Sequence, residues 1–195
     1  MTEATNFDEK TDAELVELTL KNQDIFLYLI RRYEKKLLSY IFKITNVSYE
    51  DAEDILQEVF IKVYVNLNNF DRNLKFSSWI YRIAHNEVIN NFRHYRARPQ
   101  TTDFDGKENW LTLAYDSKID KDIDVRWARE HIDIILSALD LKYREVLILK
   151  YFEEKSYEEI SDILKKPAGT VATLLNRAKA NFKQALEKMD KNIKL

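Results

Sequence analysis

The sequence predicts an all-α protein of two small helical domains joined by a flexible acidic linker. Apolar residues recur at three- and four-residue spacing through most of the chain, which is the period of an amphipathic helix. Only two Gly and two Pro interrupt the 195 residues, so long helices are favoured over a sheet with tight turns. Residues 97–127 hold one Gly and one Pro, carry many acids and lack a sustained period, and we interpret them as the linker.

The first domain is expected over residues 1–96. Thr11 and Glu14 have the spacing of a capping box, which predicts a helix that begins after Thr11. Further helices are expected at about 24–44, at about 49–67 and from Ser77 onward. In the last of these helices Trp79 is assigned to the core, because aromatic side chains in a helical protein normally point inward.

The second domain is expected over residues 128–195, with helical patterns at about 125–139, 141–152, 157–164 and 168–189. Ser156 is a plausible N-cap of the third pattern. A short break at Pro167 separates the last two patterns, which is the form of a helix-turn-helix. In such a motif the second helix enters the major groove of DNA. By pattern alone, an ordinary helical hairpin with a solvated polar face is favoured over a DNA-binding motif, and the basic charge and the Gly-Thr start of the second helix shift the balance only partway toward DNA.

Composition excludes several classes of protein. The chain has no Cys, so it forms no disulfide and no thiolate metal site, and its three His are too scattered to suggest a metal. The N-terminus is polar and acidic, unlike a signal peptide, and no apolar run approaches the roughly 18 residues that span a bilayer. We therefore expect a cytoplasmic protein with no membrane insertion, no metal and no cofactor.

Charge is distributed in blocks, although the net charge is only −2. Residues 44–71 carry six acidic side chains and one basic one, and residues 72–98 carry six basic side chains and one acidic one. Residues 165–195 carry eight basic side chains and two acidic ones. The two basic blocks could meet phosphates while the acidic block meets a different partner. A solvated charged face is the alternative for each block.

Three segments together resemble the extracytoplasmic-function group of bacterial RNA polymerase sigma factors. They are "YEDAEDILQEVFIKVY", "KFSSWIYRIAHNEVINNFR" and "REVLILKYFEEKSYEEISDIL…GTV…NRAK", in this order and with the linker before the third. The resemblance covers about residues 12–96 and 128–188. It implies a promoter-specificity subunit without catalytic activity, whose partners are core RNA polymerase, promoter DNA and an anti-sigma factor.

The resemblance also implies roles for individual residues. The acidic helix would grip the coiled coil of the largest polymerase subunit, and the second domain would also meet the polymerase flap. The docking residues would be Asp51, Asp54, Gln57, Glu58 and Ile61. The segment from Phe70 would open the −10 promoter element and hold a flipped base, through Phe70, Arg72, Asn73, Lys75, Phe76, Arg82, His85, Asn86, Arg93 and Arg96. The helix-turn-helix would read the −35 element as duplex, through Lys165, Lys166, Thr170, Thr173, Asn176, Arg177 and Lys179.

The chain departs from the family pattern at two places. Lys165 and Lys166 stand where the turn usually has Gly and an aliphatic residue, and a Lys at positive φ is strained by about 1 kcal/mol. Ala172 and Leu174 stand where the recognition helix usually has Lys and Arg. Phe70 and Phe76 divide evenly between two interpretations, as core residues or as walls of the base pocket.

Two other functions remain as alternatives. The first is a free-standing helix-turn-helix regulator that binds duplex operators as a dimer; the acidic helix and the net charge of −2 argue against it. The second is a hydrolase or transferase. Such an enzyme would need a nucleophile with its base, or a phosphate-binding Gly loop, and the sequence offers neither.

Overall fold

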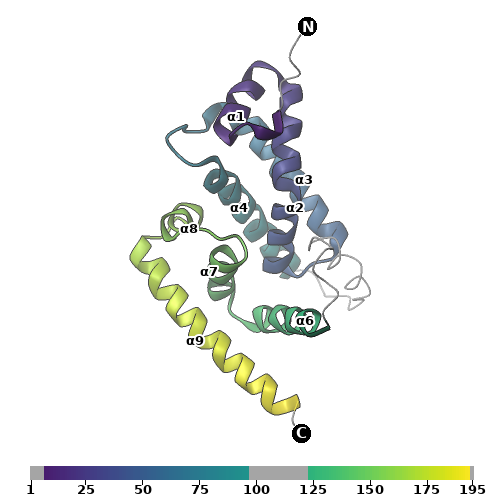
Figure 1. Cartoon of the computed structure of the whole chain (residues 1–195), viewed down its shortest axis with the longest axis vertical. Helices are drawn as coiled ribbons and strands as arrows, with labels where there is room; N and C mark the ends of the chain where they lie inside the picture. Colours follow the sequence, from purple (N-terminus) through teal and green to yellow (C-terminus); the bar gives the residue numbers. More distant parts are fainter. Residues whose placement is uncertain (1–6, 97–122, 194–195) are drawn as a thin grey trace.

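The computed structural model describes residues 7–96 and 123–193, and within these ranges every regular element is a helix. The predicted fold class is therefore confirmed, with two helical domains on either side of the linker. Residues 7–96 form four α-helices, which Figure 1 labels, and three short 3₁₀ turns. The long helices are α1 (Asp12–Lys21), α2 (Phe26–Thr45), α3 (Tyr49–Asn66) and α4 (Phe76–Arg96), and the turns are η1 (Phe7–Glu9), η2 (Gln23–Ile25) and η3 (Leu67–Asn69).

Residues 123–193 form four helices, and α8, α9 and the turn between them have the expected helix-turn-helix shape. The helices are α6 (Ile123–Ala138), α7 (Leu141–Tyr151), α8 (Tyr157–Leu164) and α9 (Ala168–Ile193). Helix α6 begins inside the range 97–127 that was assigned to the linker. The rest of that range, to residue 122, lies outside the described residues.

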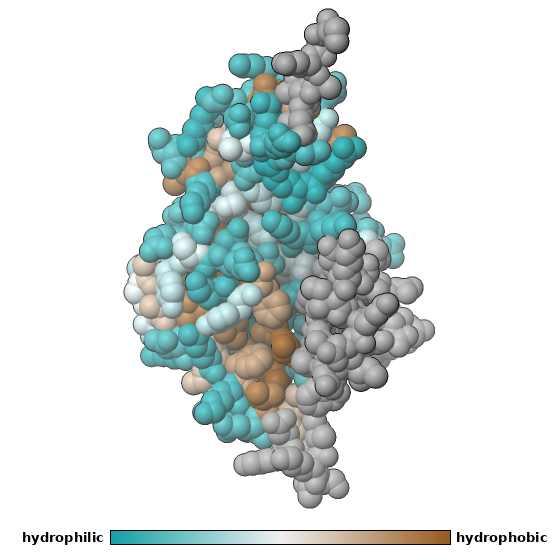
Figure 2. Space-filling view, viewed as in Figure 1, coloured by the Kyte–Doolittle hydropathy of each residue, from teal (hydrophilic) through white to brown (hydrophobic). Residues whose placement is uncertain are grey.

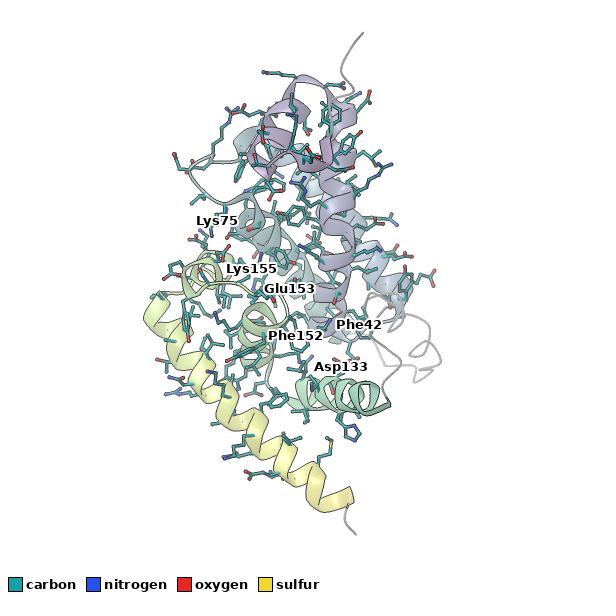
Figure 3. The ribbon with its side chains drawn as sticks, viewed as in Figure 1. Phe42, Lys75, Asp133, Phe152, Glu153 and Lys155 are labelled. Carbon is teal, nitrogen blue, oxygen red and sulfur yellow. The ribbon has the colours of Figure 1, made fainter. Side chains whose placement is uncertain are left out.

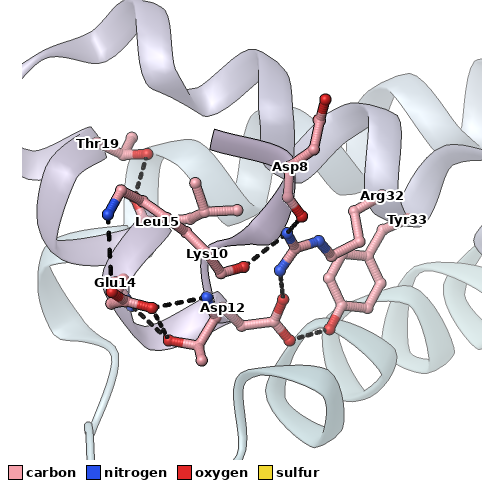
Figure 4. Close-up of polar contacts among 9 residues, drawn as sticks. Asp8, Lys10, Asp12, Glu14, Leu15, Thr19, Arg32 and Tyr33 are labelled. Atoms are coloured by element: carbon pink, nitrogen blue, oxygen red, sulfur yellow. Dashed lines mark hydrogen bonds and ion pairs between the residues drawn. The ribbon is translucent and has the colours of Figure 1, made fainter. Parts of the chain in front are cut away.

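Side-chain caps start the helices at the positions that the sequence predicts. Thr11 Oγ1 accepts a hydrogen bond from Glu14 N at 3.3 Å, and Thr11 N donates to Glu14 Oε2 at 2.8 Å, so the capping box is complete (Figure 4). Ser156 caps α8 in the same way, with Glu159 as its partner. Each box satisfies backbone N–H groups that a helix start leaves without a partner.

A partly buried polar contact holds α1 on α2. Arg32 Nη1 donates to Asp12 Oδ1 at 2.8 Å, and the Tyr33 hydroxyl donates to Asp12 Oδ2 (Figure 4). Arg32 Nη2 also donates to the Lys10 carbonyl at 2.7 Å. The start of α1 is thereby fixed against the middle of the α2 helix.

Two helices end at a residue other than Gly in the left-handed conformation. Asn46 is the C-cap of α2 with φ 56°, and Lys165 is the C-cap of α8 with φ 53°. Glu154, in the turn between α7 and α8, also has a positive φ of 53°. Lys165 therefore has the strained backbone that the sequence predicts for it. The Lys166 N–H donates to the Ser161 carbonyl at 3.2 Å and helps to close the turn of the helix-turn-helix.

The two halves share one continuous hydrophobic core. Helix α8 packs along α4, and α7 packs against α2 (Figure 1). Residues of both halves, from Leu15 to Ala178, belong to one cluster of buried side chains. This packing of one half on the other was not predicted from the sequence.

Buried Arg144 on α7 joins the halves through backbone carbonyls. Its Nη1 donates to the Ile44 carbonyl near the end of α2 at 2.8 Å, and its Nε donates to the Leu136 carbonyl near the end of α6, also at 2.8 Å. A cation is favourable at the C-terminus of a helix, where carbonyl groups lack partners. One side chain thus stabilises the ends of two helices.

Candidate functional site

The acidic residues predicted to dock on polymerase form an exposed stripe on α3. Asp54, Gln57 and Glu58 are exposed, while Ala52, Ile55 and Val59 point into the core. Ile61 extends the stripe by one turn and is 56% exposed. An exposed stripe of acids with an apolar end can bind a basic partner helix that carries an apolar residue.

Asp51, at the start of the same helix, already has a structural role. Ser48 Oγ donates to Asp51 Oδ2 at 2.7 Å, and Asp51 N donates to Ser48 Oγ at 3.1 Å. The carboxylate also lies in the first turn, where the helix dipole favours negative charge. Asp51 is therefore the predicted docking residue whose substitution would change the helix itself.

Sequence reasoning missed two residues beside this stripe. Val65 follows Ile61 by four positions, so it lies on the same face, and it is 67% exposed. Tyr64 is also exposed, and its hydroxyl donates to Gln23 Oε1 at 3.1 Å. The i, i+4 spacing from Ile61 was the signal that could have found Val65.

The aromatic residues of the predicted base pocket lie in the core. Phe70, Phe76 and Trp79 form a cluster with ring centroids 5.2 to 5.6 Å apart, and each is no more than 8% exposed. Tyr33 adds a fourth ring, 5.7 Å from that of Phe76. Aromatic pairs at these distances stabilise each other beyond the burial of their surface. The cluster fixes both ends of the loop between Phe70 and Phe76.

The polar residues of this loop are exposed. Arg72 forms an ion pair with Glu17 of α1 at 3.0 Å, and Asn73 N donates to Asp71 Oδ1 at 3.0 Å. Lys75 forms an ion pair with Glu159 of α8 at 3.4 Å. The buried aromatic cluster thus supports a short, exposed polar loop. One cation of this loop, Lys75, faces the C-terminal half.

The predicted DNA-contacting residues of α4 differ in exposure. Asn86 is exposed and Arg82 is half-buried, whereas His85 is only 9% exposed. The Tyr40 hydroxyl oxygen lies 3.4 Å from His85 Nδ1. Burial, reinforced by the charge of Lys166, lowers the pKa of His85 to about 4, so the ring is neutral at physiological pH. The side chains of Arg93 and Arg96 lie outside the described residues.

The predicted −35 residues lie together on the exposed side of the helix-turn-helix. Val171, Leu175 and Ala178 bury the opposite side of α9 against α7 and α8. The exposed residues are Lys165, Thr170, Thr173, Asn176, Arg177 and Lys179, and Lys166 is half-buried. Hydrogen-bonding groups near the N-terminal end of an exposed helix match the way a recognition helix reads base edges.

Two contacts show how this surface is organised in the free protein. The Thr173 hydroxyl donates to the Gly169 carbonyl at 2.9 Å, which leaves its oxygen free to accept. Lys179 Nζ lies 5.7 Å from the ring centroid of Tyr151, which is 53% exposed. Sequence reasoning missed Tyr151, because it ends α7 and is brought beside α9 only by the fold.

Other kinds of site have no support in the described part of the chain. Among these residues no group of three or more His, Cys, Asp or Glu side chains is arranged to hold a metal ion. No helix within residues 7–96 and 123–193 combines the length and apolarity needed to cross a bilayer. The hydropathy surface in Figure 2 is mostly polar on the face shown, with its largest apolar area in the lower half.

Comparison with known proteins matches both halves of the chain. The family model of Sigma-70 region 2 matches residues 29–98, and that of Sigma-70, region 4 matches residues 130–182. The chain is 34% identical to the ECF RNA polymerase sigma factor SigW of Bacillus subtilis, over 85% of this chain and 90% of that protein. It is 32% identical to the ECF RNA polymerase sigma-E factor of Escherichia coli K12, over 88% of this chain and 92% of that protein.

Solved structures show the same fold. CnrH in complex with the cytosolic domain of CnrY matches with a TM-score of 0.68 and 21% identity, over 91% of this chain and 97% of that one. The sigma factor RpoE in complex with the anti-sigma factor NepR, from Bartonella quintana, matches with a TM-score of 0.63 and 17% identity, over 83% and 96% of the two chains.

Proposed function

The chain belongs to the extracytoplasmic-function sigma factors, which act in transcription initiation, and we propose that it docks on core polymerase through α3 and reads a promoter through α4 and α9. The exposed acidic stripe of α3 carries the proposal. Asp54 and Glu58 are exposed to solvent, and Ile61 adds exposed apolar surface.

We infer that the −10 element contacts Asn86 and the polar loop between Phe70 and Phe76. The buried aromatic cluster holds this loop in place. An amide side chain can hydrogen-bond the edge of a flipped base, and Arg72 and Lys75 can meet phosphates. The buried positions of Phe70 and Phe76 favour their interpretation as core residues, since base stacking needs an accessible ring face.

We infer that α9 reads the −35 element in the major groove. Thr173 and Asn176 lie three positions apart on the exposed face, and Arg177 follows Asn176 directly, so one helix end can present them together. The acidic stripe favours a polymerase subunit over a free-standing operator-binding protein. Acidic side chains repel DNA, and a polymerase subunit can rely on core polymerase for most of the affinity for DNA.

We also propose that an anti-sigma factor binds the free chain. Two solved structures of the same fold are complexes. RpoE is bound to the anti-sigma factor NepR, and CnrH is bound to the cytosolic domain of CnrY. This partner would compete with polymerase for the surfaces described above. Co-purification of the chain with a partner that blocks its binding to core polymerase would support the idea.

Reconstitution with core polymerase tests the docking proposal. The protein should co-elute with core polymerase at moderate salt and support transcription that depends on promoter sequence. Asp54→Lys combined with Gln57→Ala should abolish co-elution, because it reverses one charge and removes one hydrogen-bonding group of the stripe. Failure of the unmodified protein to bind core would refute the proposal.

A matched charge reversal separates docking from general charge effects. Glu34 is exposed on α2, outside the α3 stripe, so Glu34→Lys makes the same charge change elsewhere. This variant should bind core as the unmodified protein does. Asn86→Ala should impair promoter opening more than docking, and an equal loss of both activities would contradict the role of Asn86.

A further inference from the structure

Tyr151, the last residue of α7, is exposed beside the middle of α9. The side chains that follow it turn elsewhere, since Phe152 lies toward α2 and Glu153 lies beside α4 (Figure 3). Tyr151 instead lies beside Lys179, whose Nζ is 5.7 Å from the ring centroid. One exposed aromatic residue is ordinary on a protein surface, so the contact with Lys179 is the observation that needs a reason.

This contact orients Lys179 and keeps its amine protonated. A side-chain hydrogen bond with Tyr151 raises the pKa of Lys179. An ammonium group has three donors, and a phenol oxygen that accepts one of them keeps its own proton to donate. Two donors of the ammonium and one of the hydroxyl therefore remain together at one place on the surface.

The charge of Lys179 is not neutralised by an acid. Among the side chains that the structure describes, no carboxylate forms an ion pair with Lys179. Lys183, one turn further along α9, is by contrast paired with Glu187 at 3.9 Å. A tyrosine thus holds Lys179 in place and leaves its positive charge available to an anion from outside the chain.

The pair of Tyr151 and Lys179 lies at the edge of the predicted −35 surface. Lys179 follows Asn176 by three positions, so the two exposed side chains are neighbours on α9. The N-terminal residues of a recognition helix contact base edges, and surrounding side chains contact the backbone phosphates of the duplex. Lys and Tyr are both among the residues that donate hydrogen bonds to phosphate oxygens of DNA.

We propose that Tyr151 and Lys179 together bind one backbone phosphate of duplex DNA beside the −35 element. Tyr151 donates its hydroxyl proton to this phosphate and also orients Lys179 toward it. This role rests on the proposed function, because it requires α9 to lie in the major groove. Such a contact fixes the register of the helix on the duplex without reading a base.

Holoenzyme reconstituted from core polymerase and the full-length chain tests this role on a promoter from which it initiates. Tyr151→Phe removes only the hydroxyl and should weaken promoter binding by about tenfold, because the lost hydrogen bond is to a charged group. Lys179→Ala should weaken binding and lower the slope of log affinity against log salt concentration by about one. Since both side chains serve one phosphate, Tyr151→Phe should cost less in the Lys179→Ala background than alone. Unchanged binding by Tyr151→Phe would overturn the proposal.

Tyr143→Phe is the matched control, because it makes the same change at the other end of α7. Tyr143 also lies beside a lysine, with Lys142 Nζ 5.0 Å from its ring centroid. This variant should bind the promoter as the unmodified chain does. An equal loss in the two tyrosine variants would mean that the hydroxyls act through the stability of α7, which contradicts a phosphate contact.

Neutral methylphosphonates, placed one at a time along the backbone around the −35 element, locate the phosphate. At one position the change should weaken binding of the unmodified chain by about tenfold and abolish its advantage over Tyr151→Phe. An advantage that persists at every position would refute the phosphate as the ligand.

Base substitutions within the −35 element separate this proposal from the proposed function. If they leave binding by the unmodified holoenzyme unchanged, the reading of the −35 element by α9 fails. If they weaken binding whereas Tyr151→Phe does not, only the role of Tyr151 fails. A phosphate contact also predicts that Tyr151→Phe weakens binding to the original and the substituted promoters by the same factor.

Discussion

Replacing Glu145 with Gln should stabilise the protein, and the gain should grow with pH. Glu145 of α7 is only 5% exposed, and burial raises the pKa of its carboxyl from 4.5 to about 7, although Lys166 and Arg144 oppose the shift. Ionising this group at neutral pH therefore works against folding. Gln has nearly the same shape and does not ionise.

The sign and size of the effect follow from linkage. The folded state holds a proton that the unfolded chain releases above pH 4.5, so stability falls as pH rises from about 4.5 to 7 and then levels off. The full difference between these pKa values corresponds to about 3 kcal/mol. Most of it, about 2 kcal/mol, develops between pH 5 and pH 8.

Urea unfolding followed by circular dichroism at these two pH values measures the effect. The free energy of unfolding of Glu145→Gln minus that of the unmodified protein should be about 2 kcal/mol larger at pH 8 than at pH 5. Taking the difference cancels the opposite contribution of His85, whose lowered pKa makes acid destabilising. Glu154→Gln, at an exposed position, should show no such trend. A difference in the free energy of unfolding between Glu145→Gln and the unmodified protein that is equal at both pH values, or larger at pH 5, would refute the reasoning.

Two further substitutions test the contact of Arg144 between helices and the strain at Lys165 in the turn between α8 and α9. Arg144→Met should lower the free energy of unfolding by about 3 kcal/mol, because it leaves buried carbonyls of α2 and α6 without donors. Arg144→Lys should restore little of this loss. Urea unfolding measures both variants, and a loss below about 1 kcal/mol for Arg144→Met would contradict the role of Arg144. Lys165→Gly should raise the thermal midpoint, by relief of about 1 kcal/mol of strain at φ 53°. Lys166→Gly, one position later, is its control, and an unchanged or lower midpoint for Lys165→Gly would show that the turn is not strained.

The helices could be predicted because their signals are local. The period of apolar residues places α2, α3, α8 and α9 within a few residues of their observed bounds, and the Thr11 cap follows from spacing alone. The positive φ of Lys165 could also be predicted, because the resemblance places Lys165 where the family usually has Gly.

The packing between the halves could not be predicted in the same way. Arg144 meets Ile44 across 100 residues of sequence, and Tyr81 meets Glu153 across 72, so no local pattern connects them. The burial of His85 could not be predicted for a similar reason. A helical face that looks polar in sequence can be buried when another domain supplies the partner.

The shared core makes the two halves thermodynamically dependent on each other. Separating them would expose apolar surface on both α4 and α8, so each half adds to the other's resistance to unfolding. A substitution deep within one half can therefore alter the behaviour of a helix in the other half, including one that we propose binds DNA, without touching it. Substitutions in this protein would then affect its function through the coupled stability of the two halves as much as through the residues that face a partner.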